Sequence, residues 1–196
     1  TTINVSAEVV GDAIKLTDNT GQSGTLSVQE VNNSNTAADL GILSITAAGV
    51  TTSGTGSDIF RLHAGTQLSK LNDGNGVDFN NSTTAIDDLI FEFADGSGPI
   101  GLDLSGSATL GDVVDKFNSS QALAGKVTAA ISSDGNRLVL TDLTSGAEAF
   151  SVANGLLGTA ADDLGLTVSA VGSTLTGARL TSGLNDTLLR SVNGGA

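Results

Sequence analysis

The sequence contains a second copy of part of itself, and this duplication limits the possible folds more than any other feature. Residues 2–46 align with residues 126–170 without a gap, and apolar positions such as Ile3 and Val127 coincide. A copied unit of this length predicts a tandem-module protein, in which one supersecondary unit is repeated. Catalytic sites are usually built once, so the duplication favours a structural or binding role. The identical pairs include Gly11/Gly135, Leu16/Leu140, Thr17/Thr141, Asp18/Asp142, Ser27/Ser151, Val28/Val152, Ala37/Ala161, Asp39/Asp163, Leu40/Leu164 and Gly41/Gly165.

The charge of the chain disfavours several classes of partner. The formal net charge is -13, from 21 acidic and 8 basic residues. A nucleic-acid partner requires a basic surface that displaces counterions, and anionic membranes attract basic segments in the same way. We therefore expect no nucleic-acid partner and no membrane partner. The sequence has no cysteine, which excludes disulfides and thiolate metal sites.

Both copies show the same predicted order of elements. Alternation of apolar and polar residues predicts a hairpin of two strands, and a third strand and a short helical turn follow in each copy. Gly41 and Gly165 come directly after the helical turns, where glycine can take the left-handed conformation that ends a helix. The predicted strands are 2–8, 13–17 and 25–29 in the first copy and 126–131, 137–141 and 149–153 in the second; the helical turns are 36–40 and 160–164.

The middle of the chain is not duplicated and contains the clearest helix signal. Strands are predicted over 88–93 and 100–104, and a helix over 109–118. Its apolar residues Leu110, Val113, Val114 and Phe117 form one stripe. Thr109 and Asp112 have the spacing of a helix N-cap and its capping-box partner. The Gly-rich stretch 48–57 is expected to be a loop.

These elements predict a β-rich α+β fold, with tandem β-hairpin modules and one short helix packed on antiparallel sheet. We expect a truncated first repeat unit over 1–78, made of strands and short helical turns. A second repeat unit is expected over 79–196.

Catalytic patterns are weak. His63 is the only histidine, and no serine lies in a G-x-S-x-G turn. Carboxylates are paired in three places, but the chain has no Trp or Tyr to bind a sugar ring beside them. We expect no enzyme activity, no catalytic residue and no cofactor. The pairs are Asp87–Asp88, Asp112 with Asp115, and Asp162–Asp163.

One loop has the residue types of a cation site. Asp73, Asn75 and Asp78 are spaced through a Gly-rich loop, and carboxylate and amide oxygens are the ligands that calcium prefers. The loop is similar to one nonapeptide of a calcium-binding β-roll, but β-rolls need several consecutive copies. The alternative interpretation is a tight turn after a short helix.

Residues 86–146 resemble the flagellin hook IN motif, in which two strands, a T-L-x-D-V-[IV]-x-x-[IV]-N helix and two further strands follow one another. The helix reads T-L-G-D-V-V-D-K-F-N over 109–118, and the later strands read V-T-A-A-I over 127–131 and D-G-N-R-L-V-L-T over 134–141. The dipeptide that names the motif is Phe117–Asn118 in this chain, a conservative change. Residues 2–24 resemble the second half of another copy.

The resemblance implies a non-catalytic outer module of a flagellar filament-capping protein of the hook-associated protein 2 family. It implies extracellular location on the bacterial flagellum and export by the flagellar type III apparatus. The expected partners are flagellin and other copies of the full-length protein, joined through long helices that this sequence lacks. Alternatives are an outer domain of a flagellin or of a hook–filament junction protein, or a calcium-stabilised surface adhesin repeat.

Overall fold

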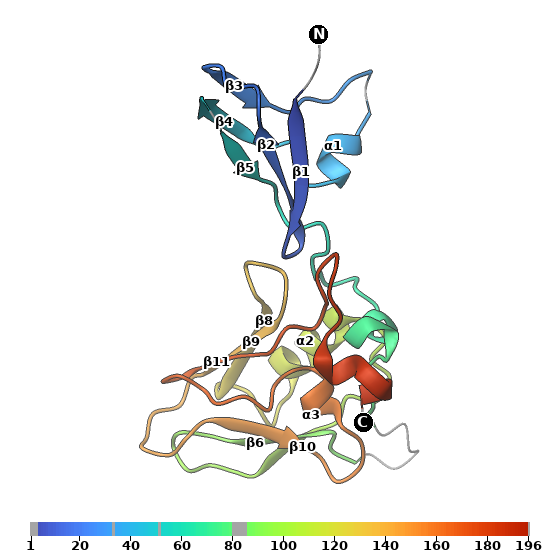
Figure 1. Cartoon of the computed structure of the whole chain (residues 1–196). Coiled ribbons are helices and arrows are strands. Elements are labelled where there is room, and N and C mark those ends of the chain that lie inside the picture. Colours follow the sequence, from blue (N-terminus) through green and yellow to red (C-terminus); the bar gives the residue numbers. More distant parts are fainter. Residues whose placement is uncertain (1–3, 33, 51, 80–85, 196) are drawn as a thin grey trace. The chain divides into compact units, whose positions relative to one another are not determined.

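The computed structural model describes residues 4–195 except 33, 51 and 80–85, and it shows a β-rich α+β fold as expected (Figure 1). The chain forms two compact units. Unit 1 consists of residues 1–61 and 182–186, and unit 2 of residues 62–181 and 187–196. The expected repeat boundary at residue 78 lies inside unit 2, because Leu62, Leu68 and Leu71 pack into the core of that unit.

Unit 1 contains two small antiparallel sheets and one helical turn. In the first sheet, β2 lies between β1 and β5; in the second, β3 pairs with β4. Few apolar side chains are covered: among the described residues of this unit, only Ala13, Ala37 and Ile45 form buried apolar positions. The elements are β1 (Val5–Val10), β2 (Ala13–Asp18), β3 (Gly24–Ser27), α1 (Thr36–Asp39), β4 (Thr46–Gly49) and β5 (Ser53–Thr55).

Unit 2 contains two three-stranded antiparallel sheets and the longest helix, α2. The strand orders are β10-β6-β7 and β11-β9-β8. Its core is continuous and includes Phe91, Phe93, Phe117 and Phe150. The elements are η1 (Leu68–Lys70), η2 (Asn72–Gly74), β6 (Leu89–Glu92), β7 (Ile100–Leu102), α2 (Leu110–Ser119), β8 (Val127–Ile131), β9 (Leu138–Asp142), β10 (Ser151–Asn154), α3 (Ala160–Asp163), β11 (Thr174–Thr176) and η3 (Leu189–Gly195).

Helix α2 confirms the prediction from its sequence. The Thr109 side chain accepts a hydrogen bond from the Asp112 amide at 3.2 Å, and the Asp112 carboxylate accepts one from the Thr109 amide at 2.8 Å. This reciprocal pair is the capping box that the spacing predicted. Leu110, Val113 and Phe117 are buried on the inner face. The helix packs on β8, and the Phe117 ring meets Phe91 edge-on with centroids 5.6 Å apart.

The capping box makes the stability of unit 2 depend on pH. Backbone N–H donors of Ala108 and Thr109 hold the pKa of Asp112 below its ordinary value of 3.8. A lowered pKa means that the carboxylate stabilises the fold above about pH 4, and that this contribution is lost as the pH falls through the folded-state pKa. We expect Asp112→Asn to lower the melting temperature near pH 7 and to change it little at about pH 2.

Thermal melts followed by circular dichroism at both pH values test this expectation. Asp115→Asn, on the exposed side of the same helix, is the matched control. An equal loss at both pH values in Asp112→Asn would show that the carboxylate charge is not the cause.

The duplication is visible in the backbone hydrogen bonds. In unit 1, the Gly41 amide donates to Ala38 and its carbonyl accepts from Ser57; in unit 2, the Gly165 amide donates to Asp162 and its carbonyl accepts from Ala178. The φ angles of the two glycines are 67° and 68°, the left-handed conformation expected after a helical turn. The duplicated sequence thus specifies the same turn twice.

The first strand shows where the gap-free alignment is wrong. Val5 lies opposite Asp18 in the β1–β2 hairpin, and Val127 lies opposite Asp142 in the β8–β9 hairpin. Val5 therefore occupies the place of Val127, which the alignment had given to Ile3. The cause is the length of the turn. In the first hairpin only Gly11 and Asp12 connect β1 to β2. In the second hairpin the Ser132 amide donates to the Arg137 carbonyl, and the turn between these two residues is longer. The segments V-S-A-E-V and V-T-A-A-I are structurally equivalent.

The loop predicted over 48–57 is also wrong, because the end of β4 and all of β5 lie there. β5 pairs with β2 in the same register as β11 pairs with β9. Gly54 faces Ile45 so closely that an added Cβ would lie 2.5 Å from the Ile45 Cγ2. Glycine is needed at this position because the neighbouring side chain fills the space beside it.

Candidate functional site

The loop predicted to bind a cation is held in a tight conformation by its own polar groups. Asn72 and Asp73 have φ angles of 53° and 56°, in the left-handed region. The buried Asn72 amide nitrogen donates to the carbonyl oxygens of Gly76 at 2.8 Å and Asp163 at 2.9 Å. The loop is therefore fixed both internally and to helix α3.

Two of the three predicted ligand residues bind the C-terminal segment of the chain. The Asp73 carboxylate accepts hydrogen bonds from the Leu188 amide at 2.9 Å and from the Ser191 hydroxyl. The Asn75 side-chain nitrogen donates to the Ser191 carbonyl at 3.0 Å. These contacts join residues more than a hundred positions apart and attach η3 to the loop.

The third residue, Asp78, lies on a small acidic cavity. Its amide donates to the Asp163 carboxylate at 2.9 Å. Asp78 lines a cavity of about 220 Å³ together with Asp162, Asp163 and Arg190. Burial lowers the pKa of the half-buried Arg190, and the charges of Asp163, Asp162 and Asp73 oppose this shift. In the described part of the chain, no three Asp, Glu, His or Cys side chains are placed to hold a metal ion.

We predict that the loop stabilises the C-terminal segment without calcium. Asp73→Ala removes the acceptor for Leu188 and Ser191, and we expect a loss of about 1–2 kcal/mol in the local stability of that segment. Hydrogen exchange of the amides of residues 188–191 measures this loss. The melting temperature of the unmodified chain is expected to be the same with millimolar calcium and with EDTA. A calcium-dependent rise that Asp73→Ala abolishes would contradict this prediction and support the cation-site hypothesis.

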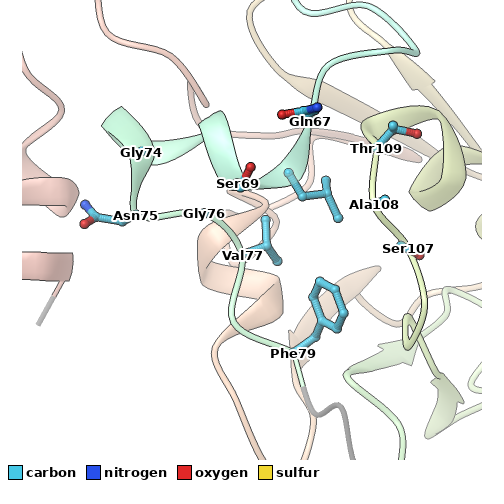
Figure 2. Close-up of a pocket in the computed structure, with 11 residues that line it drawn as sticks. Gln67, Ser69, Gly74, Asn75, Gly76, Val77, Phe79, Ser107, Ala108 and Thr109 are labelled. Carbon is cyan, nitrogen blue, oxygen red and sulfur yellow. The ribbon is translucent and has the colours of Figure 1, made fainter.

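A larger groove lies beside the same loop (Figure 2). Its volume is about 540 Å³. Figure 2 shows Val77 and Phe79 projecting into it, with the segment 107–109 on the opposite wall. None of the described residues that line it is acidic, basic or a histidine, so these residues offer no general acid or base. The lining residues are Gln67, Leu68, Ser69, Gly74, Asn75, Gly76, Val77, Phe79, Ser107, Ala108 and Thr109.

The other chemically suggestive residues have local structural contacts. His63 is exposed, and its Nδ1 accepts a hydrogen bond from the Gly65 amide at 3.1 Å. Asp88 is buried and accepts from the Leu104 amide at 2.7 Å. Asp162 accepts from the Thr167 hydroxyl at 2.7 Å and from the Asn154 side-chain nitrogen at 2.6 Å.

The residues that resemble the IN motif form one connected arrangement in unit 2. Phe117 enters the core, and Asn118 turns toward the edge of β8. The Asn118 side chain donates to the Ala129 carbonyl and accepts from the Ala129 amide, both at 2.9 Å. It pairs with the strand edge as a neighbouring strand would. The sequence pattern marks this asparagine, but carries no signal for its partner Ala129.

Comparisons with protein-family models, with curated proteins and with solved structures gave no match. Within the described residues, none of the helices is long and apolar enough to cross a membrane.

Proposed function

We propose that this chain is a structural, non-catalytic outer module of a bacterial flagellar cap or hook-associated protein that supports flagellin assembly at the filament tip. The observation that carries the proposal is the use of the motif residues. Thr109 and Asp112 start the helix, Phe117 fills the core and Asn118 covers the edge of β8. Each is used to build the module.

The acidic composition and the repeated unit agree with this role. A net charge of -13 suits a surface exposed to the medium, and a duplicated module extends a surface without a new fold. The proposed partners are flagellin and further copies of the full-length protein. The proposed location is extracellular, on the flagellum, after export by the flagellar type III apparatus.

Deletion of the encoding gene tests the proposal. We expect bare hooks under the electron microscope and monomeric flagellin in the culture medium. Re-expression of the full gene should restore filaments, and re-expression without residues 4–195 then measures what this region adds. Normal filaments and normal motility in the deletion strain would contradict the proposal.

Immunogold labelling against this region separates a cap from the related possibilities. A cap places the label at the filament tip only. Label along the whole filament would indicate a flagellin, and label at its base a hook–filament junction protein.

A further inference from the structure

The two copies of the repeat differ in how the hairpin is covered. In unit 2, α2 packs on β8, and Val127 and Ala129 of that strand are 4% and 7% exposed. In unit 1, the equivalent Val5 is 38% exposed, and every described residue of β1 is exposed. The same apolar strand pattern is therefore present in both hairpins, but in unit 1 no described element packs on β1 as α2 packs on β8.

The strand that follows the hairpin shows the same difference. In unit 2, β10 pairs with β6 along Ser151–Asn154, and Val152 is buried. The matching residues of unit 1 are Ser27–Glu30. Ser27 pairs with Thr46 of β4, and the Val28 amide donates to the Ile45 carbonyl at 3.4 Å. Among the described residues, however, no strand takes the place of β6, and Val28 stays half-exposed.

A carboxylate gives a third and independent indication. Asp142 accepts two backbone hydrogen bonds, from Thr144 and from Ala94 at the end of β6, both at 2.8 Å. Its counterpart Asp18 accepts only the equivalent of the Thr144 bond, from the Thr20 amide at 2.8 Å, as far as the described residues go. No described residue supplies the second donor. The acceptor is present in unit 1, and within the described part of the chain no segment donates to it as Ala94 donates to Asp142.

We propose that unit 1 is a docking site for a strand–strand–helix segment of the same kind as residues 86–126. The helix of this occupant carries a Leu/Val/Phe stripe against Val5, Ala7, Val9, Ile14 and Leu16. Its strand adds to Ser27–Glu30 and donates a backbone N–H to Asp18. An asparagine at the end of the helix pairs with Ala7, which holds the position of Ala129. This inference holds whether or not the protein is flagellar.

The occupant is not β6–β7–α2 of a second copy. These elements already cover β8 and pair with β10 in their own unit, and their apolar residues Leu89, Phe91 and Leu110 are fully buried there. A second copy could supply them only by unfolding its own unit 2.

The test is a chain that carries the segment twice, with residues 86–126 joined directly to Val5 in place of residues 1–4. Hydrogen exchange of the amides of β1, β2 and residues 27–30 is compared with that of the unmodified chain. We expect exchange of the β1 amides to slow by at least about tenfold. Phe117→Ser and Asn118→Ala in the added copy alone should remove most of that protection. Asp18→Asn should reduce it in the extended chain and leave the unmodified chain unchanged.

Three outcomes would overturn the proposal. The first is unchanged exchange in β1 while the peptides of unit 2 keep their protection. The second is protection of β1 in the unmodified chain that increases with protein concentration, which would identify a second copy as the occupant. If the extended chain misfolds, a separate peptide of residues 86–126 is titrated into the unmodified chain. The third outcome is that the β1 amides gain no protection from exchange at saturating peptide.

Discussion

Replacing Phe117 by alanine is expected to destabilise unit 2 by about 3–5 kcal/mol. The ring is 1% exposed, lies edge-on against Phe91 and belongs to the core cluster of unit 2. Its removal leaves a cavity between α2 and the sheets that these backbone elements cannot close. A loss of this size is a large part of the stability of a small domain, so partial unfolding near 37 °C is expected.

The measurement is native-state hydrogen exchange of core amides in β6, α2 and β9, which reports on unit 2 separately. The amides of β2 in unit 1 serve as an internal reference and should not change. Leu156→Ala is the matched control, because this leucine is 85% exposed in the same unit. A loss below about 1 kcal/mol for Phe117→Ala would mean that the helix is not anchored through this ring.

The second large effect is expected at Asp142. In Asp142→Asn one side-chain oxygen still accepts a hydrogen bond, but the new NH2 group faces the second backbone N–H donor. We expect unit 2 to lose about 1–3 kcal/mol, since a buried donor is left without an acceptor. The residue is 3% exposed, so water does not easily replace the lost acceptor.

Asp18→Asn is the matched control within the same chain. Asp18 accepts one described backbone hydrogen bond, so an amide oxygen at this position is sufficient. We expect a change of less than about 0.5 kcal/mol in unit 1. Equal losses at both positions would show that the carboxylate charge, and not the second donor, makes Asp142 important. The free energies of unfolding of the two variants are compared by urea denaturation, monitored through the hydrogen exchange of amides in β2 for unit 1 and in β9 for unit 2.

The sequence was sufficient for elements whose signals are local. Helix α2 was predicted from its stripe and capping residues, and the hairpins were predicted from alternation and turn glycines. β5 and β11 were not predicted, because their short Ser/Thr/Gly-rich segments have little alternation and are held by pairing with β2 and β9. The first strand was misaligned by two residues because the alignment followed the better-matched second strand.

The candidate site was only partly predictable for the same reason. The sequence indicated that Asp73 and Asn75 are chemically notable, and the structure places both in contact with Ser191. That partner is far away in the sequence and carries no local signal. The difference between Asp142, which accepts from Ala94, and Asp18, which has no such described donor, could not be expected either, because it depends on a comparison of two folded copies.

The two-residue difference between the hairpin turns limits how such repeats can diverge. Side chains alternate between the two faces of a strand, so shifting the β1–β2 register by one residue would turn Val5, Ala7 and Val9 away from the face of Ile14 and Leu16. A change of two residues keeps them on the same side, as in the difference between β1 and β8. Viable length variants of this turn should therefore be those in which the turn itself takes up the added residues and the register of β1 against β2 is kept.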